Sequence, residues 1–241
     1  MVSENKIAEF VERIHGAAGS NLESVILYGS AVSGDFHSEF SNLNLFCILR
    51  DSSFSSLRAL VPVARWWDRQ KQPLPLFMSR SELIRSTDVF AIELLDMQQH
   101  HRVLFGDDVL KDLQIPLRLH RVQVEYELRE KLIFFRQQLL LASGDKRRSW
   151  DLLLRSVPSF VTLFRHAVIA LGNPAPATKR EALQVLSQLV GFDPSALVQA
   201  LEVREHRSDL GKMDVDDLTA RYLAAVQQVC DAVDRMMDKD E

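Results

Sequence analysis

Two short polar segments between apolar stretches contain the residue types from which a phosphate-binding site would be built. Gly29 and Ser30 follow the apolar run 25–28, and Ser41 precedes a second apolar run that opens with Asn42 and Asn44. Strand side chains alternate between faces, so Asn42 and Asn44 would lie side by side. Backbone N–H groups of a Gly-Ser turn can surround phosphate oxygens. An ordinary turn that uses glycine for its dihedral angles is the alternative.

This pattern resembles the signature of the DNA polymerase β-like nucleotidyltransferases. That signature is an apolar strand, Gly-Ser, a spacer, and Ser-Asp-x-Asp before further apolar residues; Gly29, Ser30 and Ser41 match it. The resemblance implies attack on a nucleotide α-phosphate, with two Mg²⁺ ions that clamp the attacking and leaving oxygens. It also implies nucleotide contacts by Gly29, Ser30 and Ser41. Both aspartates of the signature are asparagines here, Asn42 and Asn44.

The asparagines remove charge from the place where the family holds its metal. Mg²⁺ is normally bound by one or two carboxylates plus substrate phosphates, whereas an amide is a neutral ligand and cannot act as a general base. The family's third carboxylate comes from a later strand. The best candidate here is 74–78, in which Pro75 or a neighbour takes that position, with no Asp or Glu between Arg69 and Arg80. We therefore expect degenerate positions at Asn42, Asn44 and Pro75 and no metal ligands.

Three other carboxylates offer an alternative. Asp35 and Glu39 lie in the spacer and Glu93 lies on an expected helix. If the chain is an active nucleotidyltransferase, one or more of them would be recruited to bind Mg²⁺ beside Asn44, with ATP as the donor. If it is not, they are solvated surface charges, because a loop rarely fixes the geometry that two ions need.

Composition limits the class of protein. The chain has 241 residues and a net charge of −4, without the basic surplus typical of nucleic-acid binders. Cys47 and Cys230 have no metal-ligand spacing and are expected to be buried thiols in a reducing compartment. No signal peptide is recognised, and no apolar stretch approaches the roughly 18 residues needed to span a bilayer. We expect a cytoplasmic protein with no membrane association.

The order of expected elements changes after Pro116. Hydrophobic periodicity predicts a small mixed sheet with helices in the first part and helices alone in the second. The predicted fold class is α+β: a nucleotidyltransferase-like domain over 1–112, followed by a helical bundle over 113–241. The arrangement is similar to that of bacterial nucleotidyltransferase-domain proteins with an appended helical domain. Strands are predicted at 24–28, 43–49, 74–78 and 102–106, and helices at 6–15, 55–68, 89–100, 117–142, 149–171, 179–190, 194–205 and 218–237.

Together these features predict a nucleotidyltransferase-fold protein that has lost metal-dependent transfer. Such a pseudoenzyme would act as a nucleotide-binding, partner-binding or regulatory module, with a nucleotide or a protein as its ligand and no required cofactor. The alternative is an active enzyme that uses Mg²⁺ and ATP to transfer a nucleoside monophosphate to an unknown acceptor. A third hypothesis is an interaction protein whose cleft is filled by its own side chains.

Overall fold

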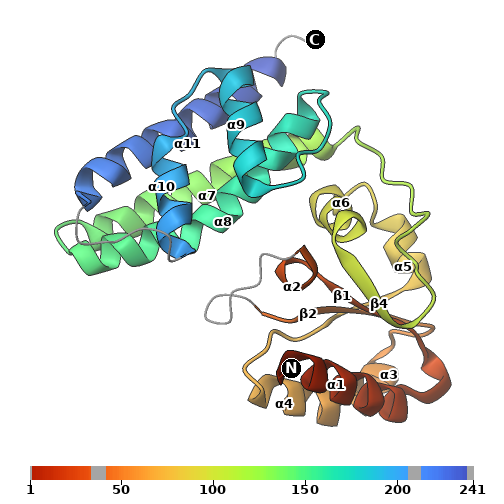
Figure 1. Ribbon diagram of the computed structural model, residues 1–241. Coiled ribbons are helices and arrows are strands. Elements are labelled where there is room, and N and C mark those ends of the chain that lie inside the picture. The colour runs from red at the N-terminus through yellow and green to blue at the C-terminus, as the bar shows by residue number, and fades with distance from the viewer. Residues whose placement is uncertain (1, 34–41, 206–212, 238–241) are drawn as a thin grey trace. The chain divides into compact units, whose positions relative to one another are not determined.

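The computed structural model describes residues 2–33, 42–205 and 213–237 (Figure 1). Contacts between Cα atoms divide the chain into two compact units, Met1–Pro116 and Leu117–Glu241. The elements of the first unit are α1 (Val2–Ala18), η1 (Gly19–Asn21), β1 (Leu22–Tyr28), α2 (Ser30–Ser33), β2 (Asn44–Leu49), α3 (Phe54–Ala59), α4 (Val61–Arg69), β3 (Leu76–Ser79), α5 (Arg80–Arg85), α6 (Ala91–Gln99) and β4 (His101–Gly106). Those of the second are α7 (His120–Ala142), α8 (Lys146–Ala170), α9 (Lys179–Val190), α10 (Ser195–Arg204) and α11 (Val215–Met237).

The first unit is built on a four-stranded mixed sheet in the order β3-β2-β1-β4. β1 is antiparallel to both β2 and β4, whereas β2 and β3 are parallel. In this register Tyr28 at the end of β1 pairs with Asn44 on one side and with His101 on the other. The α+β class with a small mixed sheet and a helical second part is confirmed, and β4, the strand predicted at 102–106, lies at an edge of the sheet.

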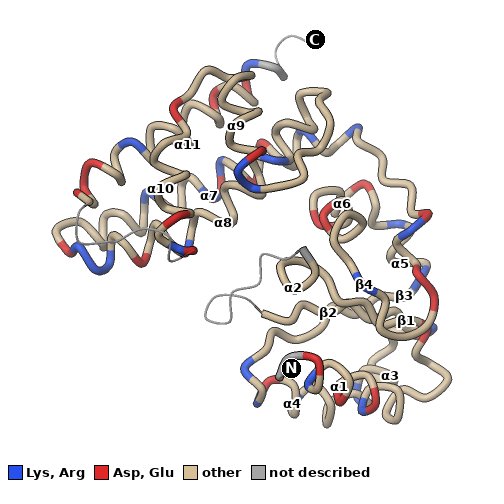
Figure 2. Tube along the Cα trace, in the orientation of Figure 1, with Lys and Arg blue, Asp and Glu red and all other residues tan. Residues whose placement is uncertain are grey.

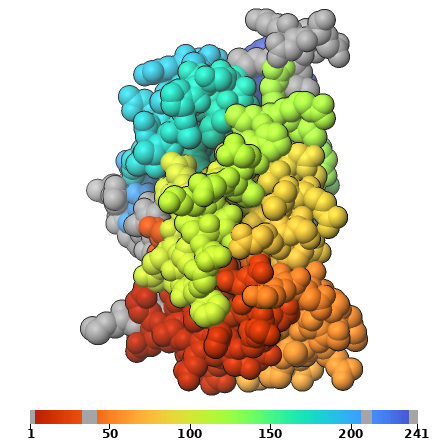
Figure 3. All heavy atoms as spheres, turned by 90° about the vertical axis from the view of Figure 1, so that its right-hand side faces the viewer, coloured from red at the N-terminus to blue at the C-terminus, as the bar shows by residue number. Residues whose placement is uncertain are grey.

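Both faces of the sheet are covered by helices. Alternate residues of β2 divide between two cores: Leu45, Cys47 and Leu49 pack with residues of α1 and α4, and Phe46 and Ile48 pack with residues of α5 and α6. In Figure 3 the orange spheres of α3 and α4 lie directly against the red N-terminal segment. A strand covered on both faces is apolar throughout rather than alternating, which explains why 45–49 is an unbroken apolar run.

Local sequence signals account for the main helix boundaries. The predicted helix over 55–68 is divided at Leu60, and Pro62 lies in the first turn of α4, where its missing N–H costs nothing. Thr178 caps α9, since its hydroxyl accepts from the Glu181 N–H at 3.1 Å. The first helix is longer than its periodic stretch and runs from Val2 to Ala18 through Gly16.

The second unit is organised around α8. This helix contacts all four other helices of the unit, and its aromatic residues join a cluster in which Phe135 stacks on Tyr222 with ring centres 5.3 Å apart. By length and composition α8 alone among the described helices could cross a membrane. More than half of its most apolar stretch is buried inside the unit, as is usual for a core helix.

Cys47 and Cys230 are both buried free thiols. Burial raises the pKa of each thiol, that of Cys230 to about 12. Neither is therefore a thiolate near neutral pH, and their packing role agrees with the prediction from sequence.

Two buried histidines are expected to make the stability of the second unit depend on pH. His120 Nε2 lies 2.9 Å from His166 Nδ1, and both side chains are buried. Burial, and secondarily the nearness of His166, lowers the pKa of His120 to about 4. As pH falls from about 6.5 towards 4 the unfolded chain binds the proton first, so the free energy of unfolding should drop by roughly 2–3 kcal/mol.

Urea denaturation between pH 7.5 and 4.5 measures this effect. The substitution His120→Gln removes the titrating ring, so its stability should fall less steeply with acid than that of the unsubstituted chain, whatever its stability at pH 7.5. Parallel pH profiles for the two proteins would show that the histidine pair is not the cause.

Candidate functional site

The Gly-Ser turn is held at the end of β1 by two backbone hydrogen bonds. Gly29 N–H donates to the His100 carbonyl at 3.1 Å, and the Gly29 carbonyl accepts from the Val32 N–H at 2.9 Å. Gly29 has a φ of +79°, a value that favours glycine. Because the Gly29 N–H is already bonded, the N–H that the turn can present to a phosphate is that of Ser30, the first residue of α2.

Asn44 lies directly against this turn. It begins β2 opposite Tyr28, and a Cβ added to Gly29 would come within 3.2 Å of Asn44 Nδ2. The structure therefore brings Asn44 against Gly29, and Ser30 is the next residue of the turn. Asn42, two residues earlier, is exposed. Ser41, Asp35 and Glu39 lie outside the described residues.

The strand expected to carry the third carboxylate position begins one residue after Pro75. β3 begins at Leu76 and pairs in parallel with β2, with Leu76 beside Phe46. Partners in a sheet share a face, so Leu76 is the strand residue on the face of Asn44 and Phe46. Pro75 precedes the strand and is buried, whereas Leu76 is 42% exposed. The residue nearest to the expected acid is thus Leu76, an exposed apolar side chain.

The two elements that follow the turn in the chain, α2 and β2, carry no formal charge. Both are tan in Figure 2, because neither contains Lys, Arg, Asp or Glu. Over the described ranges 2–33, 42–205 and 213–237, no group of three or more His, Cys, Asp or Glu side chains could hold a metal ion. Since Asn42, Asn44 and Leu76 are all neutral, the described residues do not fit the Mg²⁺ pair that the fold family implies.

Tyr28 was not among the site residues predicted from sequence, and Glu93 was predicted only as an alternative Mg²⁺ ligand. Tyr28 packs on the α6 face of the sheet, and its pKa is raised first by burial and then by the negative charge of Glu93. Tyr28 therefore stays protonated near neutral pH and can donate a hydrogen bond beside Asn44. Strand alternation could have placed Tyr28 on this face, whereas the proximity of Glu93 depends on how α6 packs.

Substitution of Gly29 tests the close packing of the turn. We expect Gly29→Ala to lower the free energy of unfolding by about 2 kcal/mol, since the new Cβ requires both a left-handed backbone and displacement of Asn44. Gly172→Ala is the matched control, because Gly172 has a φ of +76° but open space at its Cβ. Urea unfolding of both proteins gives the comparison. Equal losses would mean that Asn44 does not pack against the turn.

No family model and no curated protein sequence matches the chain. Among solved structures, it is similar to the spectinomycin adenyltransferase AAD(9) from Enterococcus faecialis, determined with ATP and spectinomycin. The TM-score is 0.58 at 13% sequence identity, and the match covers 95% of this chain and 99% of that one. At this identity the similarity shows the fold alone: the chain has a nucleotidyltransferase fold.

Proposed function

We propose that this protein is a catalytically degenerate nucleotidyltransferase that serves as a nucleotide-binding or partner-binding regulatory module. The observation that supports this most strongly is the Asn44 amide packed against the Gly29 turn, at the position where the family signature has a carboxylate. The turn and the strands around it are retained, while the negative charge that would bind Mg²⁺ is absent from Asn42, Asn44 and Leu76.

Loss of these charges disables the reaction in two ways. Mg²⁺ gives up its water reluctantly and requires carboxylate ligands in addition to phosphate oxygens. An acceptor hydroxyl also needs a base to remove its proton, and an amide cannot take that proton. The asparagines preserve the shape of the site without either capability.

Nucleotide binding is the capability that the remaining groups favour. The Ser30 N–H and hydroxyl, the Asn44 amide and the Tyr28 hydroxyl are neutral donors that suit phosphate oxygens without a metal. ATP is the first nucleotide to test, because the similar adenyltransferase was determined with it. Because α2 and β2 carry no Lys or Arg, we expect modest affinity for ATP. Modest affinity suits a regulatory module, which must release its nucleotide when the nucleotide concentration falls.

The same proposal places the protein in the cytoplasm. Burial of α8 within its own unit and the two buried free thiols both suit a water-soluble protein in a reducing compartment. A protein partner would then bind differently to the chain with and without nucleotide.

An active metal-dependent nucleotidyltransferase is the second candidate. It is favoured by Glu93, whose negative charge acts on Tyr28, the strand partner of Asn44. In this alternative, the Glu93 carboxylate would supply a ligand or a base in place of the missing aspartates.

A transfer assay separates the two candidates. The full chain is incubated with Mg²⁺, α-labelled ATP and spectinomycin, the compound found with the similar adenyltransferase, and then with a panel of other hydroxyl-bearing acceptors. We expect no labelled product with any acceptor. Labelled product that disappears in Glu93→Gln would overturn the proposal and identify Glu93 as part of an active site.

A further inference from the structure

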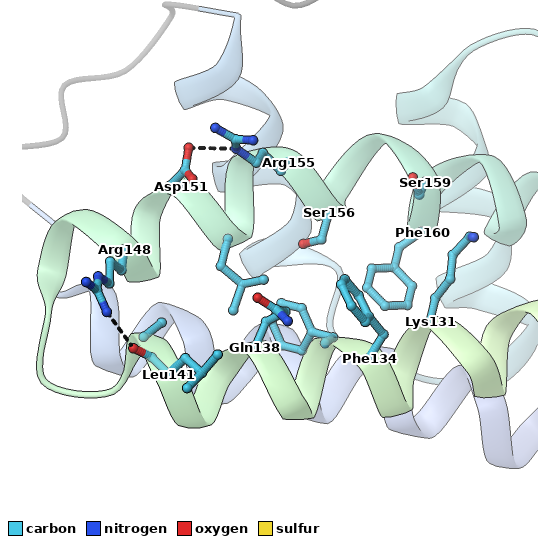
Figure 4. Close-up of a pocket in the computed structure, with 13 residues that line it drawn as sticks. Lys131, Phe134, Gln138, Leu141, Arg148, Asp151, Arg155, Ser156, Ser159 and Phe160 are labelled. Carbon is cyan, nitrogen blue, oxygen red and sulfur yellow. Dashed lines mark hydrogen bonds and ion pairs between the residues drawn. The ribbon is translucent and has the colours of Figure 1, made fainter.

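A second candidate site lies in the helical unit, independent of the Gly29 turn. A cavity of about 640 Å³ opens between α7 and α8 (Figure 4). Its volume is in the range of sites that hold small organic ligands. From Lys131 to Leu141 its α7 wall spans about 15 Å, at the helical rise per residue. The cavity is thus long enough for an elongated ligand.

The floor of this cavity is apolar and largely aromatic. Phe134, Phe135 and Phe160 line it together with Leu141 and Leu152. Phe134 and Leu141 line the cavity on α7 and are 59% and 68% exposed. Large apolar side chains exposed around a concave surface are typical of a ligand site.

The rim of the cavity is mainly basic. Lys131, Arg148 and Arg155 line it, against the single acidic residue Asp151. In Figure 4 Lys131 and Arg148 lie towards opposite ends and the Gln138 amide lies between them. An occupant with an apolar body and a negative head would satisfy both the floor and the rim.

We propose that this cavity binds an amphipathic organic anion, a molecule with an elongated apolar body and a carboxylate or similar head group. The apolar body lies on the phenylalanine floor, and the head group contacts Arg148 or Lys131 at an end. The inference goes beyond the proposed nucleotide function, since it concerns other residues and another ligand class.

The basic side chains are able to exchange their present partners for such a head group. Arg148 Nε lies 3.4 Å from Asp145, and Lys131 Nζ lies 3.1 Å from Glu127, and neither acid lines the cavity. Arg155 Nε lies 2.8 Å from Asp151. These are exposed pairs between near neighbours in sequence, a type that contributes little to stability.

Three probes with the same tail and different heads test the proposal: dodecanoate, dodecanol and dodecyltrimethylammonium. Each is titrated calorimetrically into the full chain below its micelle-forming concentration. We expect saturable binding of one dodecanoate per chain, with the cationic amphiphile bound at least about tenfold more weakly. Absence of saturable dodecanoate binding, or equal binding of the cationic amphiphile, would overturn the proposal.

Two substitutions connect binding to this cavity. Gln138→Trp fills its centre and should weaken dodecanoate binding about tenfold or more, with Ser159→Trp as a second filling variant if the first does not fold. Arg148→Gln should weaken dodecanoate binding but not dodecanol binding, whereas Arg147→Gln, next to it but outside the cavity lining, should change neither. Unchanged dodecanoate affinity in a folded filling variant would place the binding elsewhere and refute the inference.

Discussion

Replacement of both Asn42 and Asn44 by aspartate is expected to raise the affinity of the chain for Mg²⁺ about tenfold or more. Asn44 begins β2 beside the Gly29 turn, and Asn42 lies two residues earlier and is exposed; each substitution exchanges an amide nitrogen for an anionic oxygen of similar size. Mg²⁺ affinity depends strongly on the number of anionic ligands, so two added carboxylates act together. Mn²⁺ binding followed by electron paramagnetic resonance measures the change directly.

A matched control separates coordination from general charge. Asn5→Asp combined with Gln137→Glu adds the same two charges at exposed helical positions and should leave cation affinity almost unchanged. The result also distinguishes the two functional candidates. In a degenerate site, the two aspartates raise a low affinity for the cation. In an active site that already uses neutral Asn44 as a ligand, they would disturb the metal coordination and reduce nucleotidyl transfer. Equal cation affinity in the aspartate variant and the control would contradict the degenerate-site account.

Gly106→Ala is expected to lower the free energy of unfolding by about 3–4 kcal/mol, a larger loss than that expected for Gly29→Ala. Gly106 ends β4 with a φ of +73°, and a Cβ there would lie 1.9 Å from the Glu23 carbonyl oxygen on β1. A carbonyl of a central strand cannot move away without breaking the sheet.

Gly144→Ala provides the comparison, because Gly144 has a φ of +82° but nothing within 4 Å of its Cβ. Its free energy of unfolding should fall by about 1–2 kcal/mol, the cost of a left-handed backbone alone. Equilibrium urea unfolding of both variants gives the difference. A loss for Gly106→Ala no greater than that for Gly144→Ala would mean that β4 is not packed against β1 as described.

Sequence patterns predicted the local features of the site well. The run 25–30 indicated a strand followed by a glycine turn, and the next strand, predicted over 43–49, begins at Asn44. Both depend on neighbouring residues. The division of the predicted helix 55–68 near Pro62 also has a local cause, because proline is accepted in the first turn of a helix but not in its interior.

Features that depend on pairing between distant segments are less accessible from sequence. The prediction from sequence placed Pro75 or a neighbour at the third carboxylate position, because it treated 74–78 as one continuous strand. The parallel pairing with β2 starts at Leu76 instead, and this one-residue difference moves the side chain to the other face. The approach of Glu93 to Tyr28 depends on packing of α6. The cavity beside Phe134 has no sequence signal, since periodicity assigns a residue to a face of a helix and not to a hollow between two helices.

Titration of the full chain with ATP, once with Mg²⁺ and once with EDTA, is the decisive experiment for the proposed function. The proposal is that amides stand in place of the metal-binding carboxylates beside the Gly29 turn, so that ATP binds there without Mg²⁺. If this is so, the heat signal and dissociation constant for ATP will not improve when Mg²⁺ is present. ATP binding that becomes about tenfold tighter with Mg²⁺ than with EDTA would contradict this account and return the protein to the metal-dependent nucleotidyltransferases.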